Sequence, residues 1–235
     1  MMKRLAVILL LLVSLTGCRD ARVRYFWCTH SIDYSVVDSA RSQFIDYAAL
    51  ASLADTSVAR ASIDRLYDKL KKDEVAYYLY TEWVEGIFYH PFSPYCSEPL
   101  YSRAVERMGV DGVFSEDECL PYRQRLAWMR LNREGESAVV PGVTLDGQRT
   151  LVAVADLGCH SCIEVLDSLA TDGKWADVRR VAISCGHGPE FPLQGWERVL
   201  PKRTRDVFDT RYAPFCFVVS ADGVVESSYK PISEI

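Results

Sequence analysis

The 235-residue sequence predicts an α/β fold class in which an all-α domain precedes a C-terminal domain with a central mixed sheet and flanking helices. Three observations predict it. Apolar residues recur at helical spacing through the first half, short apolar runs alternate with a helical segment in the second half, and a tight turn joins two strands near the end. A hydrophobic content of 49% and a net charge of −5 are typical of a globular chain and argue against nucleic acid as a partner.

The N-terminus has the pattern of a targeting segment. Lys3 and Arg4 precede the apolar run 5–15, which is too short to span a bilayer. The following Leu15-Thr-Gly-Cys18 resembles the lipobox of bacterial lipoproteins, in which lipid is attached to the cysteine sulfur and the chain is cut before it. The alternative is an ordinary secretory signal followed by an unrelated cysteine.

The lipobox implies a signal peptide over residues 1–17 and a lipid anchor and tether over residues 18–30. One partner would then be the membrane, reached through lipid on Cys18. The chain would be a lipid-anchored protein of the cell envelope that faces the periplasm or the surface. Arg19 stands where an aspartate commonly retains lipoproteins in the inner membrane, so the outer membrane is favoured.

Residues 31–137 are predicted to form the helical domain. In 57–73 the apolar residues fall at i, i+3, i+4 and i+7, and 74–89 repeats this spacing until a proline-rich segment ends it. The tyrosines and tryptophans of this half either pack a helical core or line a groove for sugar or peptide. Two further helices complete the set, one that opens at Ser97 and one from about Pro121 to Arg133.

Residues 138–235 are predicted to form the α/β domain. The apolar run Leu151–Ala155 suits a strand buried on both faces, Cys159–Thr171 is helical, and Val178–Ser184 is a second strand. A strand, a helix and a strand in this order imply a right-handed parallel crossover. The remaining elements are a strand and turn over 143–147, a helix over 196–205 that Pro201 interrupts, a strand over 215–219, a hairpin turn at 221–223 and a last strand over 224–229.

The sequence that follows this last strand is too short for a closing helix. We therefore expect the final helix to be missing and one face of the sheet to be poorly covered, unless the helical half covers it.

Eight cysteines set the options for thiol chemistry. Lipid on Cys18 would leave an odd number, so at least one thiol is free unless it pairs with another chain. Cys96 and Cys119 lie in the same helical region and either form a disulfide or stay free. Cys216 lies inside an apolar run and is expected to be an inert core residue.

Cys159 and Cys162 form the C-x-x-C pair of the sequence. Cys159 follows a buried strand and opens a helix, where free amide protons and the helix dipole stabilise an anion. Because the thiolate is the nucleophilic form of cysteine, this position lowers the pKa of Cys159 and activates it. Cys162 lies one turn later, where its sulfur can close a disulfide with Cys159.

A buried strand, this pair at the start of a helix, and Tyr212-Ala-Pro214 before an apolar strand and hairpin together resemble the thioredoxin fold over residues 138–235. Within that fold the chain looks most like TlpA-like thiol–disulfide proteins of the envelope. The lipobox, the helical first half, and the segments 92–98 and 131–135 are similar to a Gram-negative lipoprotein group whose helical domain has no established function.

The resemblance implies thiol–disulfide exchange with protein thiols and disulfides of the envelope, together with an unidentified redox partner. Cys159 would attack a substrate disulfide and Cys162 would resolve the mixed disulfide. Pro214, which is cis in that fold, and the backbone of Ala213 would hold the substrate. The resemblance implies no metal, and no cofactor other than a redox-active disulfide between Cys159 and Cys162.

The sequence departs from the family pattern at several tuning positions. Gly158 stands where a tryptophan usually precedes the attacking cysteine, and the position of the usual buried acid falls near Ala153. Asp156 is closer to the cysteines and is expected in the loop. His160 follows Cys159 directly, so its imidazolium either stabilises the thiolate and raises the reduction potential or points into solvent.

Two other functions compete with redox exchange. A docking lipoprotein whose thioredoxin-like domain no longer turns over would account for the missing tryptophan, buried acid and final helix. A zinc-binding module would use Cys159, Cys162, Cys185 and His187, four ligands of the kinds that zinc prefers.

Overall fold

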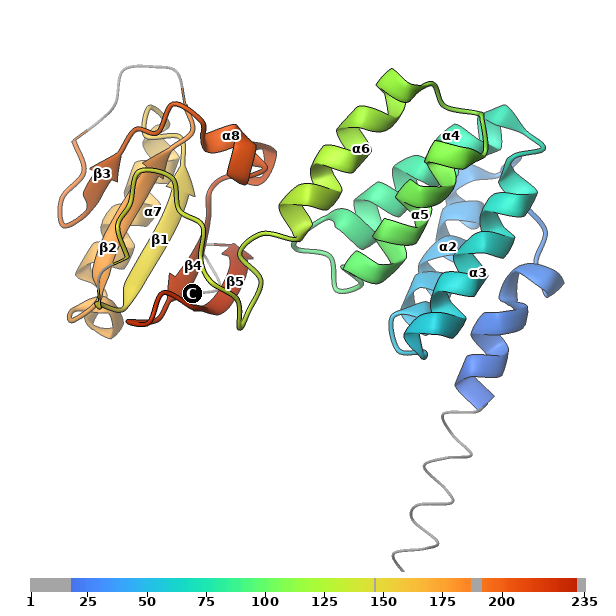
Figure 1. Ribbon diagram of the computed structural model, residues 1–235, viewed down its shortest axis with the longest axis horizontal. Coiled ribbons are helices and arrows are strands. Elements are labelled where there is room, and N and C mark those ends of the chain that lie inside the picture. The colour runs from blue at the N-terminus through green and yellow to red at the C-terminus, as the bar shows by residue number, and fades with distance from the viewer. Residues whose placement is uncertain (1–17, 146, 187–191, 232–235) are drawn as a thin grey trace, which may run out of the picture. The chain divides into compact units, whose positions relative to one another are not determined.

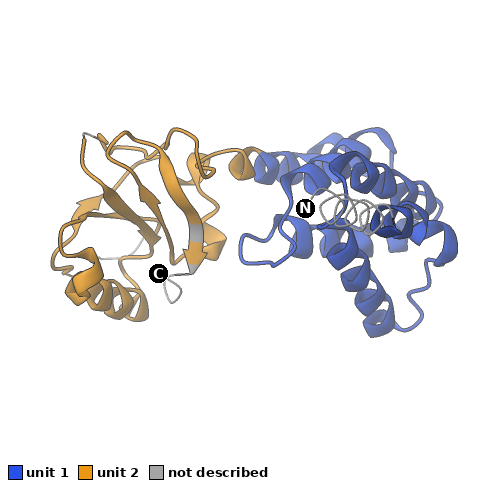
Figure 2. Ribbon diagram, turned by 90° about the horizontal axis from the view of Figure 1, so that it is seen from below, with its two compact units in different colours: residues 1–126 blue, residues 127–235 orange. Residues whose placement is uncertain are grey.

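The computed structural model describes residues 18–145, 147–186 and 192–231 (Figure 1). The chain divides into two compact units, Met1–Leu126 and Ala127–Ile235 (Figure 2). The described part of the first unit is helical and the second is a mixed sheet with flanking helices, which confirms the predicted fold class. The division lies upstream of the expected boundary at residue 137, because the intervening segment pairs with the second unit. Gly135 donates its N–H to the Val225 carbonyl and Ala138 donates to Gly223.

Residues 18–29 form a helix rather than the expected tether. Val23, Phe26 and Trp27 are buried on one side of it and join the core of the first unit. The amphipathic spacing of these residues explains the helix, since the apolar side chains fall one turn apart. The expected signal peptide, residues 1–17, lies outside the described residues. Among the helices that the structure describes, none is both long enough and apolar enough to cross a membrane.

Five α-helices and one π-helical turn follow in the first unit. The two strongest predictions are confirmed, with α3 at Thr56–Leu70 and α4 at Glu74–Val84. The last helix, α6, begins before its expected start because Ser115 and Glu118 cap it reciprocally: the Glu118 N–H donates to Ser115 Oγ and the Ser115 N–H donates to Glu118 Oε2. The remaining elements are α2 (Val37–Ala51), the π-helix Glu85–Tyr89, α5 (Glu98–Val110) and α6 (Glu116–Met129).

The aromatic residues of this unit form its core. Phe44, Tyr47, Tyr80 and Phe88 are all fully buried, and their rings meet at 5.8–6.4 Å between centroids in several pairs. Such tilted and edge-on contacts stabilise a packed interior. These four rings therefore pack a helical core, as the first of the two interpretations of the aromatic residues predicted.

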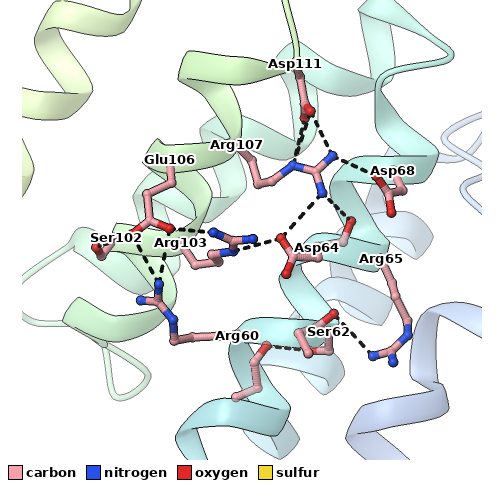
Figure 3. A network of polar contacts seen from close by, with 12 residues as sticks. Arg60, Ser62, Asp64, Arg65, Asp68, Ser102, Arg103, Glu106, Arg107 and Asp111 are labelled. Atoms are coloured by element: carbon pink, nitrogen blue, oxygen red, sulfur yellow. Dashed lines mark hydrogen bonds and ion pairs between the residues drawn. The ribbon is translucent and has the colours of Figure 1, made fainter.

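A network of charges joins α3 to α5 (Figure 3). Arg107 on α5 reaches both acids of α3, with Nη1 3.4 Å from Asp64 Oδ1 and Nη2 2.8 Å from Asp68 Oδ1. It also pairs with Asp111 one turn further along its own helix, at 2.8 Å. The Arg107 and Asp111 side chains are only 11% and 5% exposed, so this pair is shielded from solvent.

The second unit contains a five-stranded sheet in the order β3-β2-β1-β4-β5. β1 runs parallel to β2 and antiparallel to β4, and β4 forms a hairpin with β5. The predicted parallel crossover through α7 and the C-terminal hairpin are confirmed. The elements are β1 (Thr150–Ala155), α7 (His160–Thr171), a 3-10 turn (Gly173–Trp175), β2 (Arg179–Ser184), β3 (Glu197–Val199), α8 (Thr204–Val207), a second 3-10 turn (Thr210–Tyr212), β4 (Phe215–Val219) and β5 (Val225–Pro231).

Two predicted elements of this unit are wrong. The described residues of 143–147 form no strand, because Gly142 adopts a positive φ of 75° and the Val143 N–H closes a turn onto Val140. The segment 196–205 is not one helix, and only its last two residues are helical, as the start of α8. Its residues 197–199 pair with β2 as an edge strand, and Glu197 holds Arg179 of that strand at 2.7 Å.

Both faces of the sheet are covered. One face packs under α7 through Leu151, Ala153, Ala155 and neighbouring apolar residues. The other face was expected to be poorly covered, and this expectation is wrong. Six apolar residues of its three central strands are buried, and the Phe208 ring contacts two of them at about 6 Å. These buried residues are Val152, Val154, Val181, Ile183, Phe215 and Phe217.

Candidate active site

Cys159 stands at the junction of β1 and α7. β1 ends at Ala155, and the Cys159 N–H closes a turn by donating to the Asp156 carbonyl oxygen at 3.1 Å. Cys159 is the N-cap residue of α7, with an extended backbone at φ −96° and ψ 118°. The helix forms here because Ile163 and Leu166 begin an apolar stripe that packs against the sheet. The position predicted for Cys159 at a helix N-terminus is confirmed.

The groups around the Cys159 sulfur favour its thiolate. Ser161 Oγ lies 3.2 Å from Cys159 Sγ, and this contact contributes most to lowering the pKa of Cys159. The thiol and the backbone N–H of Cys162 lower it further. The positive end of the α7 dipole acts in the same direction. A partly exposed thiol with a depressed pKa is the environment of a reactive cysteine.

Cys162 lies in the opposite environment. It is only 7% exposed and packs in the core between α7 and the sheet. Burial raises the pKa of Cys162 to about 12, and the neighbouring Cys159 and Asp156 charges act in the same direction. Both cysteines carry free thiols in the structure. The pair therefore presents one thiol that ionises readily at the surface and one that keeps its proton beneath it.

Asp156 occupies the turn between β1 and Cys159, as expected. Its Oδ1 accepts a hydrogen bond from the Gly158 N–H at 2.9 Å, which fixes the carboxylate beside its own loop. The charge of this carboxylate contributes to raising the pKa of both Cys162 and Cys185. Sequence reasoning placed Asp156 near the cysteines but did not predict its effect on the pKa of the buried Cys162 thiol.

The structure places His160 on the outer face of α7 and Ser161, which sequence reasoning did not name, near the Cys159 sulfur. The His160 side chain is 77% exposed and its Nε2 lies 3.2 Å from Glu164 Oε1 on the outer face of α7. The groups that lower the pKa of Cys159 are Ser161 and Cys162, and His160 is not among them. The signal that would have found Ser161 is its place in the first turn of the helix, within reach of an N-cap side chain.

Pro214 lies beside the end of β1 from which Cys159 emerges. Phe215, the first residue of β4, is paired with Val154 in β1, so Pro214 precedes the strand at this edge. The Ala213–Pro214 peptide bond is cis. Asp209 supports the loop before it, since its carboxylate accepts from both the backbone and the guanidinium of Arg211.

Three further cysteines, Cys96, Cys119 and Cys216, are free thiols. Cys96 Sγ approaches the Tyr89 carbonyl and Cys119 Sγ approaches the Met108 carbonyl, so both are free thiols and no disulfide joins them. Cys216 is fully buried in β4, as predicted.

The described residues contain no group that matches the zinc site considered as an alternative. Within residues 18–145, 147–186 and 192–231, no group of three or more histidine, cysteine, aspartate or glutamate side chains could hold a metal ion. His187, one of the four ligands considered, lies outside these residues.

Comparison with known proteins supports the fold of this chain. No family model matches the sequence, and no curated protein does. Among solved structures, a thioredoxin-like protein from Bacteroides caccae matches with a TM-score of 0.71 at 18% identity, covering 93% of this chain and 91% of that one. The C-terminal domain of an uncharacterized protein from Bacteroides fragilis matches 44% of this chain with a TM-score of 0.36 at 17% identity. The chain therefore has a thioredoxin-like fold with a helical N-terminal region.

Proposed function

We propose that this protein is a thiol–disulfide oxidoreductase of the cell envelope, anchored in the membrane through lipid on Cys18. The observation that carries the proposal is the asymmetry of the C-x-x-C pair. Cys159 is partly exposed with a lowered pKa, whereas Cys162 is buried with a pKa raised to about 12. Exchange needs this difference in pKa, because one sulfur must attack as a thiolate while the other stays protonated until the second displacement.

The reaction takes place in two displacements. The Cys159 thiolate attacks one sulfur of a substrate disulfide, the substrate S–S bond breaks, and a thiolate leaves. Cys162 then loses its proton and attacks Cys159 Sγ, which breaks the mixed disulfide and releases the second substrate thiol. Two electrons pass to the substrate and the protein is left with a Cys159–Cys162 disulfide, which a second, dithiol partner reduces.

The substrate binds beside the same sheet edge in this proposal. Pro214 and the backbone of Ala213 hold the substrate chain, as the family resemblance implies. Their place next to the end of β1 supports this role, because Cys159 emerges from that strand. Protein thiols and disulfides of the envelope are the expected partners.

Trapping of the mixed disulfide tests the proposal. In the full chain, Cys162→Ser should accumulate substrate proteins joined to Cys159 through bonds that dithiothreitol releases, because no thiol remains to resolve them. Cys159→Ser should trap none, and Cys28→Ser, which alters an exposed cysteine of the helical unit, should behave as the unmodified protein. Reduction of a model protein disulfide should be lost in both active-site variants.

A chain that only docks its partners would give a different result. It would reduce no disulfide at any measurable rate, and Cys162→Ser would trap no more protein than Cys159→Ser. That outcome would reject redox exchange and support the docking alternative.

A further inference from the structure

The helix at residues 18–29 carries a stripe of small and apolar side chains on its outer side. Cys18, Ala21, Tyr25 and Cys28 recur at i, i+3, i+7 and i+10, so they lie along one side of the helix. All four are exposed, Tyr25 at 56%, whereas the opposite side of the helix is buried in the helical unit. The stripe begins at the cysteine to which the proposed lipid is attached.

Contacts near both ends of this helix hold the stripe outward. The Asp55 N–H, just before α3, donates to Asp20 Oδ1 at 3.1 Å. Near the end of α3, Lys69 Nζ donates to the His30 carbonyl at 2.8 Å. The helix therefore lies along α3 in a fixed rotation, with its buried side toward the unit.

Two exposed arginines flank the stripe. Arg22 lines a pocket between the helix and α2, and Arg24 lines a separate pocket between the helix and α3. Asp20 is the one acid in the sequence of residues 18–29, and its carboxylate accepts from the Asp55 backbone. An exposed apolar stripe flanked by arginines is typical of a helix that lies in the interface of a membrane.

The pocket beside α3 has the chemistry of a phosphate site. Its volume is about 270 Å³, and none of its lining residues is acidic: Arg24, Ser57, Val58, Ala61 and Arg65. Arg65 is half-buried and donates to the Ala61 carbonyl of its own helix at 3.2 Å. Neither Arg24 nor Arg65 forms an ion pair within the part of the chain that the structure describes. Two guanidinium groups at one pocket favour an anion between them, and phosphate is an anion that arginine binds through two hydrogen bonds.

The acid at the edge of this region is already engaged. Asp55 is the N-cap residue of α3, and its side chain accepts from the N–H groups of Ser57 and Val58. Its charge is therefore directed at the first turn of α3, and it is not a residue that lines the pocket.

We propose that helix 18–29 lies flat on the membrane beside its own anchor, with a headgroup phosphate of an anionic lipid bound between Arg24 and Arg65, an inference that rests on the proposed lipid at Cys18. The stripe spans about 15 Å at 1.5 Å per residue. A flat helix therefore brings the whole stripe into the headgroup layer, where a tyrosine such as Tyr25 is favoured. The helical unit would thus meet the membrane with one defined face.

Two observations select a lipid surface as the partner. The lipid on Cys18 would bring the stripe to the bilayer before any other partner is met. The arginines beside the stripe complement the negative charge of anionic lipids, which attract basic residues close to the surface.

Cys28 reports whether the stripe is covered. The lipidated protein made from the full chain is placed in lipid nanodiscs of phosphatidylcholine, or of equal parts phosphatidylcholine and phosphatidylglycerol. A sulfonated maleimide, which stays in water, then alkylates Cys28, and mass spectrometry measures the rate. We expect Cys28 to react more slowly in the anionic discs. The difference should disappear in about 1 M salt, where the Debye length falls to about 3 Å.

Substitutions in the pocket test the phosphate site. Arg24→Ala and Arg65→Ala should each lower the ratio of protected to reactive Cys28 about fivefold in anionic discs, the contribution of one arginine near such a surface. Arg41→Ala is the matched control, because it removes an exposed arginine of α2 that lines neither pocket. Leu120→Cys, at an exposed position of α6, adds a control thiol whose rate should not depend on the lipid.

The outcomes separate this surface from the anchor on which it rests. Equal Cys28 rates in the two kinds of disc would overturn the membrane surface, and protection that survives both pocket substitutions would overturn the phosphate site. Both results would leave the lipid anchor in place. The mass of the N-terminal peptide tests the anchor itself, and a Cys18 without lipid would reject the anchor together with the surface.

Discussion

At the scale of single residues, the environments of two thiols three positions apart differ more than their sequence suggests. Cys159 is the N-cap residue of α7, and Ser161 Oγ lies 3.2 Å from its sulfur. Cys162 is buried between α7 and the sheet and is 7% exposed. The first environment lowers a thiol pKa and the second raises it. This difference supports the proposal that Cys159 attacks the substrate disulfide and Cys162 resolves the mixed disulfide.

The contribution of Ser161 can be measured directly. Ser161→Ala removes the hydroxyl that stabilises the Cys159 thiolate, so the pKa of Cys159 should move up toward its ordinary value. Alkylation of Cys159 by iodoacetamide depends on the thiolate fraction, so at neutral pH its rate should fall severalfold and its pH midpoint should move to higher pH. Cys162 should stay unreactive until far more alkaline pH. Ser168→Ala, on the exposed face of α7, should leave the profile unchanged, and an unshifted midpoint in Ser161→Ala would contradict the assignment.

At the scale of elements, one shielded arginine takes part in the ion pairs that join α3 to α5. Arg107 binds Asp64, Asp68 and Asp111 at once, and its side chain is 11% exposed (Figure 3). Lys71 also pairs with Asp68, at 3.2 Å, but both of these side chains are about half exposed. Removing a shielded partner leaves buried charge uncompensated, whereas an exposed pair is screened by water.

Two substitutions that each remove a partner of Asp68 should therefore differ in their effect on stability. Arg107→Ala should reduce the free energy of opening of the α3–α5 pair by about 2–3 kcal/mol, and Lys71→Ala by about 1 kcal/mol or less. Hydrogen exchange of α3 and α5 amides in the full chain measures both values. Equal losses in the two variants would show that shielding of Arg107 contributes nothing.

At the scale of the whole molecule, the order of helices and strands was predictable because apolar residues recur at regular spacing along the longer elements. The helices α3 and α4, the parallel β1–β2 pair and the β4–β5 hairpin all follow from apolar spacing and turn residues. The errors lie where side-chain contacts decide. A capping box moves the start of α6, and pairing with β2 makes residues 197–199 an edge strand in place of a predicted helix.

The candidate site, like the fold, was predicted only in part from the sequence. The N-terminal position of Cys159 in α7 follows from a buried strand before the pair and an apolar stripe after it. The close approach of Gly186, after β2, to the Asp156 carboxylate, after β1, joins two segments far apart in the sequence, and no local pattern encodes it. The sequence predicted Asp156 in the loop near the cysteines but not its approach to Gly186.

The central claim is that Cys159 and Cys162 form a redox pair, and its most direct test is their oxidation state across a series of glutathione buffers. The full chain is equilibrated in each buffer, its free thiols are alkylated, and the modified cysteines are identified by mass spectrometry. We expect Cys159 and Cys162 to change together from dithiol to disulfide at one reversible midpoint, while buried Cys216 stays a thiol throughout. If Cys159 and Cys162 both remain alkylatable under the most oxidising buffer, the protein is not a thiol–disulfide oxidoreductase.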